Sequence, residues 1–343
     1  MININVGAFY AKLEAEMDKV VIGYKSIKRL SVAAMLSDNH VLLEGLPGTA
    51  KSLFCEVFQC TFSGSLSARI QMTADVKPMD IIGVKVYNPS TGKFDIELGP
   101  LPGRNFVLVD EINRAPGKSL SSVLSAMQER RVYISGKEIV LPDPFFIMAT
   151  QNPVEQEGVY PLPEAAIDRF AIKLIVPYAS AEEEEQILMT EALDMRDPQS
   201  IVQQVASIQE LAEMRQAIKK NVYVSPAAMQ YIVALIRSTR PGLAEHTRVA
   251  KANTEFGKLI EIGSSVRGEL ALRGMARVLA AMAGRSYVLP EDIQEVVEPV
   301  LRHRIALNFE SIASGKTSEV AIKAIVEHTP FSKDTDKYVQ NAK

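Results

Sequence analysis

The residues best suited to bind a phosphate group lie in one glycine-containing segment near the start of the chain. Residues 45–52 read Gly-Leu-Pro-Gly-Thr-Ala-Lys-Ser, which fits the template GxxxxGK[ST] except that Ala50 replaces its second glycine. We expect Ala50 to start the following helix with a negative φ, where a Cβ is tolerated, and Gly48 to supply the flexible position. Backbone N–H groups would then hold phosphate oxygens, with Lys51 at the β- and γ-phosphates and Ser52 on Mg²⁺. The alternative is a tight turn with an incidental lysine.

Two carboxylates follow a later apolar segment. Residues 106–109 read Phe-Val-Leu-Val and are followed directly by Asp110 and Glu111. If this segment is a buried strand, both carboxylates emerge at its carboxyl end, which is where open α/β sheets bind ligands. Asp110 suits water-mediated contact with Mg²⁺, and Glu111 suits the base that polarises an attacking water. The alternative is an ordinary solvated strand end.

A third apolar segment also ends in a polar side chain. Residues 145–149 read Phe-Phe-Ile-Met-Ala, and Asn152 follows after Thr150 and Gln151. Asn152 could hold a water between the γ-phosphate and Glu111, or it could simply occupy a turn before Pro153. Because three strand ends each carry a suitable group, a nucleotide site is favoured over three unrelated polar residues.

These side chains need a sheet to position them, and the hydrophobic pattern predicts one. The chain is largely helical up to about residue 40, and short apolar strands then alternate with helices up to about residue 178. This alternation predicts a parallel sheet covered on both faces. The segments predicted as its strands are 41–44, 66–72, 106–109, 145–150 and 171–176. Two further segments, 82–98 and 131–142, are predicted as hairpins.

The second half of the chain has a different pattern. From about residue 180 to 327 the sequence favours helices almost throughout, with Ser180/Glu183 and Ser207/Glu210 spaced as capping boxes. We therefore expect a nucleotide-binding core over 1–178, a helical lid over 179–330 and a flexible tail over 331–343.

Composition excludes several functional classes. A net charge of −3 disfavours a nucleic-acid-coating protein, and the absence of Trp disfavours base stacking as the main activity. The two cysteines, Cys55 and Cys60, cannot form a four-thiolate zinc site. The chain has no apolar run long enough to span a membrane, and its first twenty residues are too charged for a signal peptide. These features predict a cytoplasmic protein.

Several stretches together resemble the MoxR family of AAA+ ATPases, in the group that carries a hairpin inserted in helix 2. The resemblance covers roughly residues 5–305. The stretches that carry it are 42–52, Asp110-Glu111-Ile112-Asn113-Arg114-Ala115, Ala126-Met127-Gln128-Glu129-Arg130, Ala149-Thr150-Gln151-Asn152-Pro153 and Leu162-Pro163-Glu164-Ala165-Ala166-Ile167-Asp168-Arg169-Phe170. Alanine before the lysine of the first stretch is usual in this family.

The resemblance implies a fold and a set of site residues. The fold is an αβα core with a five-stranded parallel sheet, followed by an all-helical lid, in subunits that form a hexameric ring. Arg169 matches the arginine finger that reaches the neighbouring subunit, and Arg267 matches sensor 2, although Val266 stands where the family often has Pro. Asn152 matches sensor 1. The positions implied to contact ATP are Val21, Ile22, Gly45, Pro47, Gly48, Thr49, Ala50, Lys51, Ser52, Leu53 and Arg267.

The resemblance also implies an activity and partners. The expected function is ATP hydrolysis with Mg²⁺, coupled to remodelling or activating a client protein, including metal-cofactor insertion, beside a partner with a von Willebrand factor A domain. The two hairpins would face the pore and contact the client, or be plain surface hairpins. Arg114 could act in trans or form a structural ion pair. The alternatives are a magnesium-chelatase-type ring subunit, a nucleotide-switched binding module with little hydrolysis, and a DNA-remodelling motor.

Overall fold

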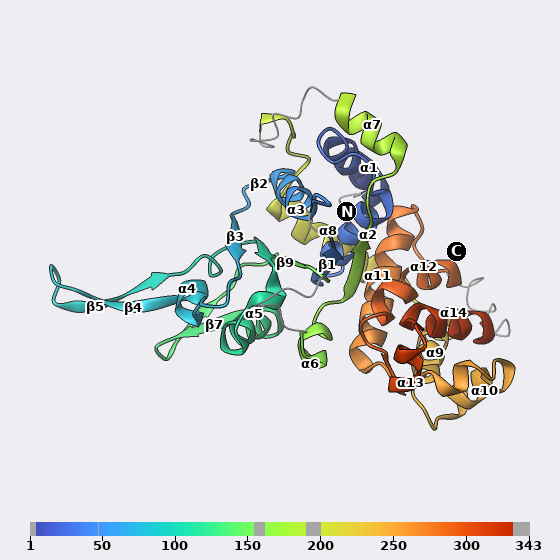
Figure 1. Ribbon diagram of the computed structural model, residues 1–343. Helices are drawn as coiled ribbons and strands as arrows, with labels where there is room; N and C mark the ends of the chain where they lie inside the picture. The colour runs from blue at the N-terminus through green and yellow to red at the C-terminus, as the bar shows by residue number, and fades with distance from the viewer. Residues whose placement is uncertain (1–4, 47, 154–161, 190–199, 332–343) are drawn as a thin grey trace.

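A five-stranded parallel sheet forms the centre of the protein (Figure 1). The structure is a computed structural model that describes residues 5–46, 48–153, 162–189 and 200–331. The strands lie in the order β10-β1-β9-β6-β3. Their bounds are Val41–Gly45 for β1, Ser67–Gln71 for β3, Phe106–Asp110 for β6, Phe146–Gln151 for β9 and Ile172–Val176 for β10. The predicted fold class is confirmed, and each predicted strand is present within two residues of its expected ends.

Helices cover both faces of this sheet, as alternate side chains of the strands require. In β1, Val41 and Leu43 belong to one buried cluster and Leu42 to the other. The helices that pack with the first cluster include α2 and α3, and those with the second include α5. Successive side chains of a strand point to opposite faces, so a near-continuous apolar strand must be covered on both sides. The α-helices between residues 25 and 167 are α2 (Lys25–Leu36), α3 (Lys51–Cys60), α4 (Pro78–Ile82), α5 (Gly117–Glu129) and α6 (Glu164–Ile167).

The predicted N-terminal helical stretch is interrupted. Helix α1 covers Val6–Met17, and residues 18–24 form a non-helical loop before α2. The fully buried Lys28 holds this loop, because its ammonium group donates hydrogen bonds to the Asp18 carboxylate and to the carbonyl of Val21. A buried cation needs such partners, so the break depends on a tertiary contact that local helix propensity does not reveal.

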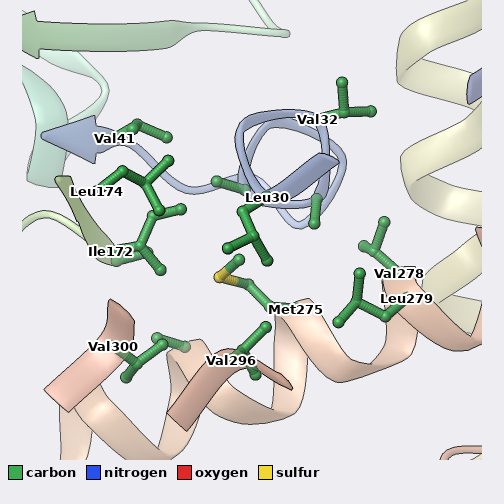
Figure 2. Packing of buried hydrophobic residues seen from close by; sticks show 14 of the residues in the cluster. Leu30, Val32, Val41, Ile172, Leu174, Met275, Val278, Leu279, Val296 and Val300 are labelled. Atoms are coloured by element: carbon green, nitrogen blue, oxygen red, sulfur yellow. The ribbon is translucent and has the colours of Figure 1, made fainter. Parts of the chain in front are cut away.

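The C-terminal half is helical and packs directly on the core. Figure 2 shows Met275 of α11 and Val296 of α12 facing Leu30 of α2, next to Ile172 of β10. The lid and the core therefore share one hydrophobic cluster. The elements of this half are α7 (Ala181–Met189), α8 (Ile208–Asn221), α9 (Pro226–Ser238), α10 (Ala244–Ala252), α11 (Val266–Met282), α12 (Pro290–Leu301), α13 (Phe309–Ala313) and α14 (Ser318–His328).

Short strand pairs complete the described part of the chain. Strand β2 (Phe62–Ser63) pairs with β11 (Ala206–Ser207), and β12 (Ile260–Ile262) pairs with β13 (Ala306–Leu307). Both predicted capping boxes form, at Ser180/Glu183 and at Ser207/Glu210.

Both predicted hairpins are present. Strands β4 (Gly83–Asn88) and β5 (Lys93–Leu98) form the long arm that extends away from the body in Figure 1. Strands β7 (Arg131–Ile134) and β8 (Lys137–Val140) form the second, shorter hairpin. Across the described ranges, none of the helices combines the length and the apolar character needed to cross a bilayer.

Candidate functional site

The loop between β1 and α3 has the backbone of a phosphate cradle. Gly48 has φ +83° and Ala50 has φ +53°, so both are left-handed. The expectation of a negative φ at Ala50 is therefore wrong: the loop adopts the conformation that a glycine would accept more easily, at a cost of roughly 1–2 kcal/mol for an L-residue. At Gly45 the constraint is space, since a Cβ would lie 2.7 Å from the carbonyl oxygen of Val176 in β10.

Lys51 occupies the first position of α3 and folds back over this loop. Its Nζ donates hydrogen bonds to the carbonyl oxygens of Gly45 (2.7 Å) and Leu46 (2.6 Å), and approaches the hydroxyl of Thr49 at 3.3 Å. Burial lowers the pKa of this ammonium group, while Asp110 and Glu111 act in the opposite direction. Phosphate oxygens could take the place of these neutral acceptors and would pair with the charge more strongly.

Asp110 lies at the end of β6 and connects three elements. Its carboxylate accepts hydrogen bonds from Ser52 of α3 (3.0 Å), from Arg69 of β3 (2.7 Å) and from the Thr150 hydroxyl of β9. Burial alone would raise the pKa of Asp110, but the hydrogen bonds from Thr150, Arg69 and Ser52 outweigh it and lower this pKa. The carboxylate is therefore ionised at neutral pH and fixed in place.

Glu111 stands beside Asp110 in a strained backbone conformation. Its φ is +53°, and its backbone N–H donates to the Thr150 hydroxyl at 3.0 Å. Its carboxylate forms an ion pair with Arg114 at 2.9 Å, and both side chains are about two-fifths exposed. Such non-glycine residues with positive φ concentrate at functional sites, where neighbouring contacts hold them. The ion pair considered for Arg114 is present, and its action on a neighbouring subunit stays a prediction.

Asn152 follows β9 directly and is tied to the same sheet edge. Its backbone carbonyl accepts a hydrogen bond from the Asn113 side chain at 3.0 Å. Because β9 lies between β1 and β6, Asn152, Lys51, Asp110 and Glu111 follow neighbouring strands at one edge. The structure thus brings together the groups that the three strand ends predicted.

A cleft of about 250 Å³ opens beside the loop. Its lining includes the apolar side chains of Val21 and Ile22, from the loop held by Lys28, and also Tyr178. Of the residues predicted to contact ATP, those that line this cleft are Val21, Ile22, Gly48, Thr49, Ala50 and Leu53. Pro47, which was predicted with them, lies outside the described residues. A largely apolar cleft beside the phosphate loop could hold a planar heteroaromatic base.

The donor set at Asp110 fits a magnesium ion. The Ser52 hydroxyl and the Asp110 carboxylate are hard oxygen ligands, and they lie 3.0 Å apart. Mg²⁺ prefers one or two such protein oxygens together with waters and substrate phosphates. These two residues, with the loop amides, are therefore the ones that would hold a metal–nucleotide pair.

Two predicted site residues lie elsewhere. Strand β10 runs parallel to β1, with Ile172 opposite Val41 and Val176 opposite Gly45. Arg169 precedes β10, so it lies at the opposite edge of the sheet from the phosphate loop, roughly 13 Å or more away at about 3.3 Å per strand residue. Arg267 is near it, since its guanidinium hydrogen-bonds Asp168 (3.0 Å) and Gln128 (3.2 Å). Neither arginine contacts the phosphate loop in the described part of the chain.

Comparison with known proteins agrees with this geometry. Residues 40–172 match the model of the ATPase family associated with various cellular activities (AAA), and residues 253–325 match the AAA lid domain. The chain is 41% identical to the chaperone MoxR1 of Mycobacterium tuberculosis, over 91% of this chain and 79% of the relative. The chain belongs to the MoxR family of AAA ATPases.

Two further proteins are similar to this MoxR-family chain. The crystal structure of a presumed ATPase from Cytophaga hutchinsonii superposes with a TM-score of 0.83 at 36% identity, covering 96% of this chain and 97% of that one. A magnesium-chelatase subunit of Chlamydomonas reinhardtii is more distant, at 25% identity over 71% of this chain and 52% of the relative.

Several residues that support the site in this MoxR-family chain were not predicted from the sequence. Thr150 joins Asp110 to the backbone of Glu111, Arg69 contacts Asp110 from the edge strand, and Lys28 fixes the cleft loop. Arg304 of the lid contacts Asp168 beside Arg169. Thr150 stood within a recognised motif, two residues before Asn152, and its place on a strand beside β6 could have indicated its role. The partners of Arg69 and Arg304 lie 41 and 136 positions away in the sequence, and those of Lys28 lie 7 and 10 positions away, before α2 begins. No helix or strand spacing predicts these contacts.

Proposed function

We propose that this protein binds ATP with Mg²⁺ at the β1–α3 loop and hydrolyses it in a ring of identical subunits. The observation that carries the proposal is the meeting of Ser52, Asp110 and Glu111, through Thr150, at one sheet edge. In a strand-end arrangement of this kind, phosphoryl transfer depends on positioning and on charge stabilisation.

Each residue has a distinct task in this scheme. Lys51 pairs with phosphate oxygens in exchange for the loop carbonyls, and Ser52 with Asp110 holds the metal. Glu111 orients and polarises the attacking water, and Asn152 holds that water from the neighbouring strand. Ionised Asp110 needs no proton transfer to take up its role, because its hydrogen bonds already favour the charged form.

Arg169 and Arg267 would complete the site of a neighbouring subunit. Their position supports this, because Arg169 precedes β10 and Arg267 binds Asp168 beside it, both away from the phosphate loop of the same chain. A trans-acting arginine can accelerate hydrolysis about 10³–10⁵-fold.

Client remodelling is the proposed use of this hydrolysis. The hairpins carry exposed apolar side chains, with Tyr87 52%, Phe94 61% and Val140 69% exposed. These side chains give the two hairpins an apolar surface for an unfolded or flexible client. From its composition we expect the protein to act in the cytoplasm. By its family we expect a hexamer beside a partner with a von Willebrand factor A domain, with metal-cofactor insertion as one form of client maturation.

The decisive test uses two variants whose defects lie in different places. Glu111→Gln should bind ATP normally and abolish turnover, and Arg169→Ala should bind ATP but lose the rise in specific ATPase activity with protein concentration. A mixture of the two variants should regain activity. In it, Glu111→Gln subunits supply an intact Arg169 to the phosphate sites of Arg169→Ala subunits, which still carry Glu111. Normal turnover by Glu111→Gln would refute the role of Glu111. Full activity of Arg169→Ala at high concentration would refute the trans site.

A further inference from the structure

Asp168, the residue before Arg169, connects the core to the lid. It caps the C-terminus of α6, which lies between α5 and α11 in Figure 1. One carboxylate oxygen accepts from Arg304 Nε at 2.9 Å. The other accepts from Arg267 at 3.0 Å and from Ser265 at 3.1 Å. Three donors of the lid therefore meet one carboxylate of the core.

Arg304 strengthens this connection from the lid side. Its side chain is only 2% exposed, and its guanidinium also donates to the carbonyl oxygens of Asp168 (3.0 Å), Phe170 (2.5 Å) and Ala171 (2.8 Å). The guanidinium of Arg304 thus hydrogen-bonds the backbone on both sides of Arg169. Burial lowers the pKa of Arg304 to about 10, against the raising effect of Asp168, so the group remains charged at neutral pH.

Asp168 also fixes the beginning of α11. Ser265 is the N-cap of this helix and Arg267 lies in its first turn. A carboxylate at a helix N-terminus complements the helix dipole, so the Asp168 charge stabilises the start of α11 as well as its two arginine partners. Helix α11 then continues into the cluster that the lid shares with α2. The lid is therefore bonded to Asp168 both through Arg304 and through the start of α11.

We propose that Asp168 is a positioning residue, which with Arg304 holds Arg169 and Arg267 as one rigid unit that moves with the lid. The inference rests on the proposed function, in which these two arginines act on the neighbouring subunit's ATP. Loss of the Asp168 carboxylate would let the two arginines move independently, so a subunit would lose its action on its neighbour while its own phosphate loop stayed intact.

The test compares Asp168→Asn with a matched control inside the lid. Asp292 is 5% exposed and pairs with Arg285 at 2.6 and 2.7 Å, so Asp292→Asn also breaks a buried pair, away from α6. At a temperature where all variants are folded, Asp168→Asn should bind ATP with unchanged affinity and hydrolyse it at least tenfold more slowly than Asp292→Asn. Arg304→Lys, which keeps the charge but cannot span the same acceptors, should behave like Asp168→Asn.

Mixing experiments show where the defect acts. Asp168→Asn subunits mixed with Glu111→Gln subunits should regain activity, because the first retain an intact phosphate site and the second supply intact arginines. A slow Asp168→Asn enzyme that mixing does not rescue would overturn the inference, as would wild-type activity of this variant.

Hydrogen exchange measures the same connection without hydrolysis. Asp168→Asn should accelerate amide exchange both around 166–171 and at the start of α11, whereas Asp292→Asn should leave both segments unchanged. Unchanged exchange in Asp168→Asn would refute the rigid unit even if ATP turnover behaves as proposed. Absence of turnover in the wild-type chain would instead refute the proposed function, and the exchange result would still decide the role of Asp168.

Discussion

The Thr150 hydroxyl offers the sharpest test of how the site is held together. It is 1% exposed, donates to Asp110 and accepts from the Glu111 backbone N–H. Thr150→Val keeps the shape and removes both hydrogen bonds. A hydrogen bond to a charged group contributes about 1.5–3 kcal/mol, and a buried N–H left unpaired costs about 1–3 kcal/mol. Since the valine methyl regains part of this by burial, we expect the free energy of unfolding to fall by about 3 kcal/mol.

The measurement is urea unfolding at pH 7 followed by far-UV circular dichroism, together with steady-state ATPase assays. Thr150→Ser is the matched control, because it keeps the hydroxyl and loses one methyl group, at a cost of about 1 kcal/mol. Thr150→Val should also lower ATP turnover by about tenfold with little change in ATP affinity, because Glu111 loses its backbone anchor. A free energy of unfolding for Thr150→Val within 1 kcal/mol of the wild-type value would refute this role of the hydroxyl. An equal loss of stability in Thr150→Ser would refute it as well.

Three further predictions follow from contacts described above. Burial lowers the pKa of His40 and His303 well below the usual value, so both are neutral when folded and take up protons on unfolding. Stability measured by urea unfolding should therefore fall as pH drops below about 6.5, by up to about 1.4 kcal/mol per pH unit for each histidine, with a shallower slope in His40→Gln. Gly45→Ala should cost about 1–3 kcal/mol by overpacking against β10 and weaken ATP binding in calorimetry; Gly48→Ala, where a Cβ meets no atom within 4 Å, should cost only the strain of about 1–2 kcal/mol at φ +83°. Phe94→Ser should leave basal ATPase unchanged and reduce its stimulation by an unfolded model protein, and undiminished stimulation would remove this hairpin face from client contact.

The sheet and the strand-end residues were predictable because they depend on local patterns. Apolar strands buried on both faces read as continuous runs, and a polar residue directly after such a run must emerge at the sheet edge. Asp110, Glu111 and Asn152 could be placed from this argument alone, before any relative was considered. The capping box at Ser207 depends on the same kind of short-range spacing.

The rest depended on tertiary contacts that spacing along the sequence does not show. The break after Met17 is held by Lys28, and the spacing of the phosphate-loop residues did not reveal the positive φ of Ala50. Arg267 carried a family role, but its partner Asp168 lies 99 positions earlier in the chain. Spacing patterns describe one helix or one strand at a time, so a cluster built from two domains is visible only once the fold is known.

The strand order has a consequence for how the chain matures during synthesis. Strand β1 is made early, but its neighbours in the sheet are β9 and β10, with Val41 opposite Met148 and Ile172. At about 5–20 residues per second, the ribosome needs several seconds to deliver those partners. Until then β1 has two unpaired edges, and exposed edges of apolar strands pair readily with other chains. The chain would thus pass through an aggregation-prone stage during its own synthesis, and slower translation of the segment before β9 would lengthen that stage.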